Sequence, residues 1–116
     1  MPTGRARTQN RTRRGRISSR AWAEAVAKAL SHPDRIQILR TVERDGTTST
    51  SEIAEKTARS LPQLSYHVRE LKSAGLLRRA RTRQVRGAIE TFYELTATGT
   101  AALKAVEAVT RLAPKG

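Results

Sequence analysis

Apolar residues at helical spacing predict two helices in the first half of the chain. The first covers residues 21–30, is rich in alanine, and can be capped by Ser18 or Ser19. The second begins at Pro33, a residue that suits the first helical turn, and ends at the turn signal Asp45-Gly46. The apolar residues of the two patterns are Trp22, Val26, Ala29 and Leu30 in the first and Ile36, Ile38, Leu39 and Val42 in the second.

Two shorter helices joined by a tight turn follow a very short strand at Thr47-Thr48. They cover residues 51–58 and 61–74, and the second ends at Gly75, which can adopt the left-handed C-cap. Each begins with a capping-box spacing, in which a serine is followed three positions later by Glu or Gln. These capping pairs are Ser49 with Glu52 and Ser60 with Gln63. Such a pair of helices is typical of a helix-turn-helix.

A β-hairpin and a final helix complete the pattern. Residues 76–82 and 88–96 are predicted strands around a turn at Val85-Arg86-Gly87, and a hairpin in this place is a wing. The final helix covers residues 98–112, with an apolar stripe of Ala102, Ala105, Val106, Val109 and Leu112. The predicted fold is mainly α with a small β-hairpin wing: a winged helix-turn-helix in a single domain over residues 19–113.

The helix over residues 61–74 has a face that can read DNA. On a helical wheel Leu64, Val68 and Leu71 cluster toward the core. The opposite side carries Pro62, Tyr66, Arg69 and Ser73, with Gln63 and Glu70 at one margin and Ser65 at the other. A helix fits the major groove, where Arg reads guanine edges and Gln reads adenine edges. The base or near-base candidates are Gln63, Ser65, Tyr66 and Arg69, and an ordinary solvated face is the alternative.

Both histidines allow a structural explanation as well as a functional one. His67 lies at the border of the core face, where it can pack half-buried or bond a phosphate; the alternative is a pH or metal sensor. His32 can help to cap the second helix, although Ser31 is the better cap by chemistry. Two histidines without cysteine argue against a zinc site within one chain, so no metal or cofactor is expected.

The charge of the chain is concentrated in two segments. Lys and Arg total 23 against 10 Asp and Glu, a net charge of +13. Seven arginines lie in residues 1–20 and five in residues 78–86, which leaves +1 for the rest of the chain. Such a field indicates a polyanionic partner, most often nucleic acid.

The two basic segments differ in what they can fold into. Residues 1–18 contain one Ile and no aromatic residue, so they are predicted to form a disordered arm, with Arg13, Arg14 and Arg16 as DNA contacts. A solvated tail or leader and a transit peptide are the alternatives. In the wing, Arg78, Arg79, Arg81, Arg83 and Arg86 are phosphate candidates, the last three nearest the tip. Not all five can face the groove, because side chains alternate along a strand.

Several classes of function are excluded by what the chain lacks. It has no cysteine, which rules out disulfides, thiolate zinc sites and a cysteine nucleophile. No apolar run approaches the ~20 residues of a membrane span, and no signal peptide is evident. A cytoplasmic, nucleoid-associated location without membrane contact is expected. No Gly-rich phosphate loop, Ser/His/acid constellation or metal cluster stands out, so the chain is not expected to be an enzyme.

Residues 60–77 carry a specific pattern, with Ser then Pro near the start, Ser65, His67, Leu71 and an Ala74-Gly75-Leu76 ending. With this pattern as its most specific part, the stretch from Ala29 to Gly99 resembles the ArsR-type winged-helix transcriptional regulators. Leu30, Pro33, Arg35, Ile38 and Leu39 match the opening of the family's second helix. The segment Gln84-Val85-Arg86-Gly87-Ala88-Ile89-Glu90 with Phe92-Tyr93 is similar to a branch common in actinobacterial proteins of this type.

The resemblance implies a homodimer built from the first and last helices. Two apolar stripes agree with it: Trp22, Val26 and Leu30, and Ala102, Val106, Val109 and Leu112. The alternative is that these stripes only complete the core of a monomer. Metal-sensing members carry a cysteine motif on the third helix or a His/Asp set on the last helix. This chain has neither, so metal sensing is not carried over and any effector stays unknown.

The function predicted from these residues is that of a sequence-specific regulator of transcription. A dimeric repressor would place the helix over residues 61–74 in the major groove of double-stranded DNA. The wing, residues 78–93, and the arm would hold phosphates or the minor groove. The alternative is a nonspecific architectural protein that binds DNA or RNA, although few aromatic residues are present for stacking on single strands.

Overall fold

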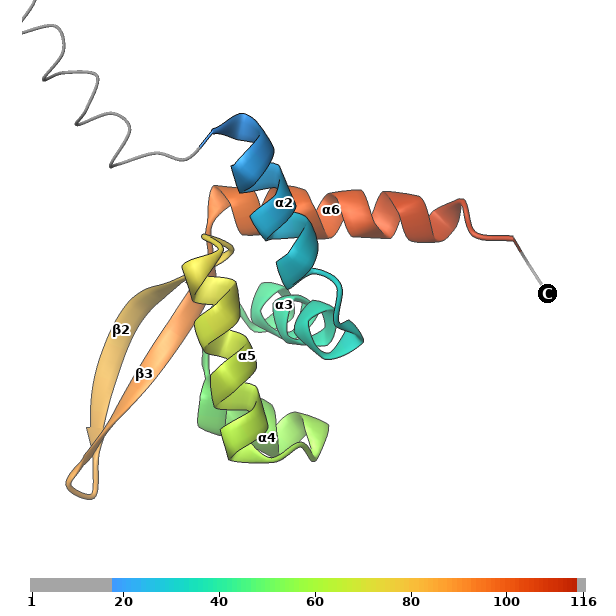
Figure 1. Ribbon diagram of the computed structural model, residues 1–116. Helices are drawn as coiled ribbons and strands as arrows, with labels where there is room; N and C mark the ends of the chain where they lie inside the picture. The colour runs from blue at the N-terminus through green and yellow to red at the C-terminus, as the bar shows by residue number, and fades with distance from the viewer. Residues whose placement is uncertain (1–17, 115–116) are drawn as a thin grey trace, which may run out of the picture.

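The computed structural model describes residues 18–114, which form five helices and a three-stranded sheet (Figure 1). In chain order these elements are α2 (Ser19–Ala29), α3 (Pro33–Asp45), β1 (Thr48–Ser49), α4 (Thr50–Thr57), α5 (Leu61–Ser73), β2 (Leu77–Val85), β3 (Ala88–Leu95) and α6 (Ala97–Arg111). The candidate contacts Arg13, Arg14 and Arg16, in the arm, lie outside the described residues.

The core lies where α3, α4, α5 and α6 meet. The inward positions predicted for the helices are confirmed, since Ile38, Leu39, Val42, Ile53, Leu64, Val68 and Leu71 are all buried. Three more leucines are buried with them: Leu76 just before β2, Leu77 in β2 and Leu103 in α6. The hairpin projects on one side of this core next to α5, and α6 extends away on the other side (Figure 1).

Side-chain caps fix the starts of four helices. Ser18, Ser49, Ser60 and Thr96 each accept a hydrogen bond from the backbone N–H three positions later, at 2.9–3.3 Å. The capping role predicted for Ser31 is wrong. Its hydroxyl donates to the Lys28 carbonyl (2.6 Å) at the end of α2, and the N-cap of α3 is His32, which makes no side-chain cap bond. Pro33 needs no cap partner for its nitrogen, and Asp34 favours the helix start by its charge.

The wing is longer than predicted. Arg86 and Gly87 have φ angles of 49° and 79°, the left-handed pair that closes a two-residue hairpin turn. This turn pairs Val85 with Ala88, so β2 reaches Val85 instead of ending at residue 82. The other elements begin and end within two residues of their predicted bounds.

The sheet has the order β1-β3-β2 and is antiparallel throughout. The short strand β1 pairs with the middle of β3, which ties the base of the wing to the start of α4. α6 packs closely on the beginning of β2. A Cβ on Gly99 would lie 2.1 Å from the Leu76 carbonyl oxygen, so only glycine permits this approach.

Candidate nucleic-acid interface

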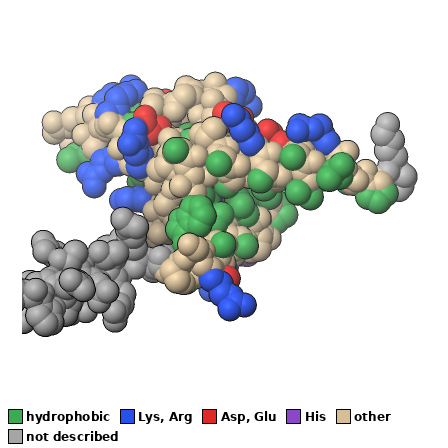
Figure 2. Space-filling model, turned by 90° about the horizontal axis from the view of Figure 1, so that it is seen from above, with side chains coloured by type: hydrophobic (Ala, Val, Ile, Leu, Met, Phe, Trp, Pro, Cys, Tyr) green, Lys and Arg blue, Asp and Glu red, His purple; other side chains and the backbone are tan. Residues whose placement is uncertain are grey.

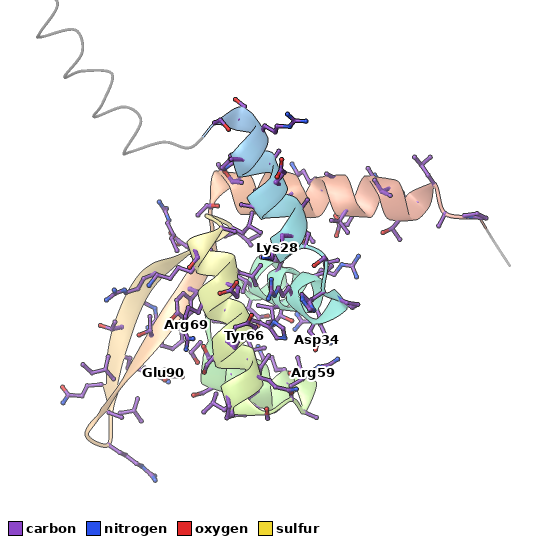
Figure 3. All side chains as sticks on the ribbon, in the orientation of Figure 1. Lys28, Asp34, Arg59, Tyr66, Arg69 and Glu90 are labelled. Carbon is purple, nitrogen blue, oxygen red and sulfur yellow. The ribbon has the colours of Figure 1, made fainter. Side chains whose placement is uncertain are left out.

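The outward face of α5 is polar and accessible. Gln63, Tyr66 and Arg69 are exposed, and Ser65 is half-buried beside them. Arg69 lies on the side of α5 toward the hairpin, and Tyr66 lies nearer the middle of the helix (Figure 3). The side chain of Gln63 is held by Ser60, the N-cap residue of α5, whose hydroxyl donates a hydrogen bond to its Oε1 atom (3.3 Å). The four candidates on α5 therefore form one surface.

A buried arginine supports this surface from below. Arg35, on α3, is 4% exposed, and its Nε donates to the Nδ1 atom of His67 (3.0 Å). Its guanidinium carbon also lies 5.7 Å from the centre of the Tyr66 ring. His67 is half-buried, and burial together with the Arg35 charge lowers its pKa. The imidazole is therefore a neutral packing residue and hydrogen-bond acceptor, which is the structural explanation that the sequence allowed.

A β-bulge aligns three wing arginines on one face. Arg79 pairs with Tyr93 and Arg81 pairs with Phe92, so Ala80 is an extra residue in β2. Arg78, Arg81 and Arg83 consequently lie opposite alternate residues of β3, which are Glu94, Phe92 and Glu90. Directly paired residues share a face, so these three arginines point the same way and Arg79 points the other way.

Two of these arginines are paired with carboxylates. Arg78 bonds Glu94 (2.6 Å) and Arg83 bonds Glu90 (2.7 Å). Glu90 also accepts a hydrogen bond from the hydroxyl of Ser49, the N-cap of α4. Together Ser49 and Arg83 hold the pKa of the Glu90 carboxyl below its usual range. The carboxylate thus connects the wing to the helix-turn-helix.

Phe92 supports Arg81 from beneath. The ring is 2% exposed, and the guanidinium carbon of Arg81 lies 3.9 Å from the ring centre. This phenylalanine is thus the largest fully buried side chain of the described residues, and it lies in the wing. Within residues 18–114, Arg79, Arg81 and Arg86 form no ion pair with a carboxylate. The charges of Arg81 in the strand and of Arg86 at the tip are thus available to a ligand, whereas Arg83 is paired with Glu90.

A second surface, formed by α2 and α6, is apolar. Hydrophobic side chains gather where the two helices cross and continue along the projecting end of α6 (Figure 2). Two neighbouring cavities of about 420 and 360 Å³ open there, and Val26 and Ala102 line both. Trp22 is 46%, Val109 68% and Leu112 82% exposed, whereas Ala102 is buried in the core and Val26, Leu30 and Val106 are half-buried. The predicted dimer residues are thus brought together, with Ala102 also serving the core.

Within residues 18–114, no helix is both long enough and apolar enough to pass through a membrane. In the same part of the chain, no three His, Asp or Glu side chains lie close enough to hold a metal ion.

The chain was compared with known families and structures. Residues 30–80 match the model of a helix-turn-helix domain family. HlyU from Vibrio cholerae is 25% identical, with a TM-score of 0.63 over 81% of this chain and 97% of that one. HlyU from Vibrio vulnificus, a transcriptional regulator, is 27% identical, with a TM-score of 0.57 over 77% and 88%. No curated protein matches the chain.

A third solved structure is the homodimeric winged helix-turn-helix DNA-binding domain of Mb0332 from Mycobacterium bovis, described as a possible ArsR-family transcriptional regulator. It is 24% identical, with a TM-score of 0.69 over 82% of this chain and 83% of that one. The predicted winged helix-turn-helix fold is therefore confirmed. The residues matched by the helix-turn-helix family model, 30–80, lie within this fold.

Proposed function

Since this chain is a winged helix-turn-helix protein, similar to the ArsR-type DNA-binding transcriptional regulators, we propose that it is a dimeric repressor that recognises a specific sequence of double-stranded DNA. The observation that carries the proposal is that the polar face of α5 is accessible and that the arginine-rich hairpin projects next to α5 (Figure 1). One part supplies hydrogen-bonding groups for bases, and the other supplies charge for phosphates.

In this proposal α5 enters the major groove. Arg69 and Gln63 have the donors and acceptors that distinguish guanine and adenine edges, and Tyr66 and Ser65 lie close enough to assist. The cap at Ser60 and the Arg35–His67 hydrogen bond beneath Tyr66 hold this face rigid before DNA binds. Specificity then comes from α5, because the wing arginines contact no base edges in this arrangement.

The wing and the arm supply affinity. Arg81 and Arg86 meet phosphates next to the groove, and Arg83 follows when DNA competes with Glu90 for its guanidinium. Arg13, Arg14 and Arg16 of the arm add contacts to phosphates or to the adjacent minor groove. Each neutralised phosphate releases condensed counterions, so binding weakens steeply as salt rises.

Dimerisation uses the α2–α6 surface. The homodimeric domain of Mb0332 gives a precedent for this fold. Trp22, Val109 and Leu112 remain exposed on the single chain, and a second copy would cover them around a two-fold axis. Two α5 helices related by that axis would read two half-sites of a palindrome. A cytoplasmic, nucleoid-associated location follows from the proposal.

The test is a selection from random double-stranded DNA with the full chain at physiological salt. Enrichment of a two-fold symmetric motif is the expected result. Binding without any enriched motif would contradict the proposal and favour the nonspecific architectural alternative, and the same selection would then be repeated with RNA.

A further inference from the structure

A small notch lies where the ends of α2 and α5 meet the start of α3. It has a volume of about 170 Å³ and is lined by Lys28 from α2, Arg35 from α3, Glu70 and Ser73 from α5, and three alanines. Lys28 stands at the end of α2, close to where α3 and α5 meet that helix (Figure 3). We infer that this notch binds a singly charged oxyanion, a phosphate diester or a carboxylate, with Arg35 as its floor.

The first argument is that Arg35 is a buried cation without a counter-ion. Only 4% of the residue is exposed, and within residues 18–114 no carboxylate forms an ion pair with it. The neighbouring carboxylate of Asp34 is taken by Arg59, with Nη2 to Oδ1 at 2.9 Å. A buried charge is costly unless it is paired and hydrogen-bonded, so an anion at this place would be strongly favoured.

The second argument is that the terminal nitrogens of Arg35 have no hydrogen-bond partner among the described residues. The hydrogen bond that the described residues give this guanidinium runs from Nε to His67. No buried side-chain nitrogen or oxygen in this part of the chain lacks a partner, so the two Nη groups must reach solvent. Arg35 lines the notch, so these N–H groups are placed to reach a ligand bound there. A planar guanidinium that presents two adjacent N–H groups matches the two oxygens of a phosphate or carboxylate.

The surrounding groups determine the charge and the chemistry of the ligand. Lys28 and Arg35 contribute two positive charges and Glu70 one negative charge, so one negative charge balances the site. The Ser73 hydroxyl adds a donor at the rim. Free small oxyanions and the backbone phosphates of bound DNA share this chemistry, and both can reach the border of the α5 face.

Occupation of the notch would act on the DNA-reading face. Arg35 holds His67 through Nε and lies 5.7 Å from the Tyr66 ring, so a ligand that draws the guanidinium outward changes the support of both side chains. This inference rests on the proposed function only for that coupling, because oxyanion binding itself can be measured without DNA.

The test uses dimethyl phosphate and acetate as probes of the full chain, at constant ionic strength against chloride. In ¹⁵N NMR, the Arg35 Nε–H and the backbone N–H groups of Lys28 and Ser73 should shift with saturation. Lys28→Ala should weaken probe binding by about fivefold. Lys72→Ala, an exposed lysine of α5 outside the notch, is the control and should change nothing.

Arg35→Lys keeps the positive charge but removes the two adjacent N–H groups of the guanidinium. If the variant folds, the NMR shifts caused by the probes should no longer saturate. Because that variant can fail to fold, Ser73→Ala at the rim provides a second one, with a smaller loss of affinity. Shifts that do not saturate, or equal affinities in the Lys28→Ala and Lys72→Ala variants, would overturn the inference.

DNA distinguishes the two sources of the oxyanion. If a backbone phosphate fills the notch, DNA should abolish the dimethyl phosphate shifts, and Lys28→Ala should reduce the salt slope of DNA binding by about 0.9. If a free anion fills it, the slope should stay the same, and the probe should change the DNA affinity of the wild type more than that of Lys28→Ala. A chain that binds the probes but no DNA would keep the notch and refute the repressor proposal.

Discussion

Helices α5 and α6 are built alike at their starts and differ on their outer faces. Each has a hydroxyl residue as N-cap, and each buries one side against the same core. The exposed side of α5 carries Gln63, Tyr66 and Arg69. The exposed side of α6 carries Val109 and Leu112.

This difference shows how one small core can present two kinds of surface. Polar groups on α5 can exchange water for DNA bases without leaving apolar area exposed. Apolar side chains on α6 gain free energy only when another apolar surface covers them, as another copy of the chain would. The helix proposed to read DNA and the helix proposed to join two copies are therefore distinguished by their outer residues and not by their backbones.

The largest expected effect comes from placing a charge on the outer face of α6. Val109→Glu removes a side chain from the proposed dimer surface and would bury a carboxylate there. In a two-fold dimer the change counts twice, so association should weaken by about 3 kcal/mol or more, roughly hundredfold in the dissociation constant. Sedimentation equilibrium measures it.

Lys104→Glu, on the same helix but outside the apolar cavities, is the matched control and should leave association unchanged. Val109 is 68% exposed in the single chain, so the monomer should keep its helical circular dichroism. A dimer that tolerates Val109→Glu would contradict the role given to α6.

The two caps provide the next largest effects. Thr96 accepts from the Gly99 N–H (2.9 Å) and its hydroxyl donates to the Gly75 carbonyl, so Thr96→Ala should cost about 2 kcal/mol of unfolding free energy. Ser60→Ala should cost about 1 kcal/mol, because the cap of α5 is exposed. Urea unfolding measures both.

The same pair of variants sharpens the comparison through DNA binding. Ser60→Ala loosens the turn that holds Gln63, so it should weaken specific binding beyond its effect on stability. Thr96→Ala should leave the DNA affinity of the folded protein unchanged. Equal effects of both variants on DNA affinity would argue that α5 has no special part in recognition. Ser51→Ala, in the first turn of α4, controls for loss of a serine that is not a cap.

Much of α5 could be predicted from the sequence, because its core face, its cap and its outer face follow from local spacing. The Arg83–Glu90 pair could also be predicted from the sequence, since a two-residue turn at Arg86-Gly87 places these residues opposite each other. The bulge at Ala80 was not, because it depends on how the sheet packs and has no local signal. Without it, Arg78 would not share a face with Arg81 and Arg83.

The contacts of Arg35 and Phe92 could not be predicted either. Arg35 and His67 are 32 residues apart, and only the packing of α3 against α5 joins them. Phe92 sits in a strand whose alternation allows two assignments of the inner face. In the structure Tyr93 and Leu95 pack against the helical core, and Phe92 lies on the other face of the strand under Arg81.

A third prediction concerns how the wing divides its charge. Glu90→Gln and Glu94→Gln each remove the charge that pairs with an arginine. Each should steepen the salt slope of DNA binding by up to about 0.9, because the arginine is no longer shared between a carboxylate and a phosphate. Glu90→Gln should in addition lower stability, since Glu90 also accepts the Ser49 hydroxyl hydrogen bond. DNA titrations at several salt concentrations and urea unfolding separate the two; a slope that stays constant in both variants would remove Arg78 and Arg83 from the DNA contacts.

The smallest effect is a dependence of stability on pH through His67. Burial and Arg35 place its folded-state pKa below the ordinary imidazole value of about 6.5. The neutral form is favoured by folding, so this stabilisation is complete above about pH 6.5 and is lost as pH falls through the folded-state pKa. Between about pH 7.5 and pH 5.5, the wild type should lose more stability than His67→Gln, which keeps an acceptor for Arg35. Equal losses would contradict this.

The most direct test of the account is the specificity ratio of Arg69→Ala. Binding of wild type and variant is measured by fluorescence anisotropy on the enriched DNA site and on a shuffled duplex of the same length. The account predicts that the variant loses about 1–3 kcal/mol on the enriched site and little on the shuffled duplex, so the ratio falls by tenfold or more. Lys72→Ala, on the same helix, should weaken both duplexes equally. An unchanged ratio in Arg69→Ala would contradict the assignment of α5 as the helix that reads DNA through this face.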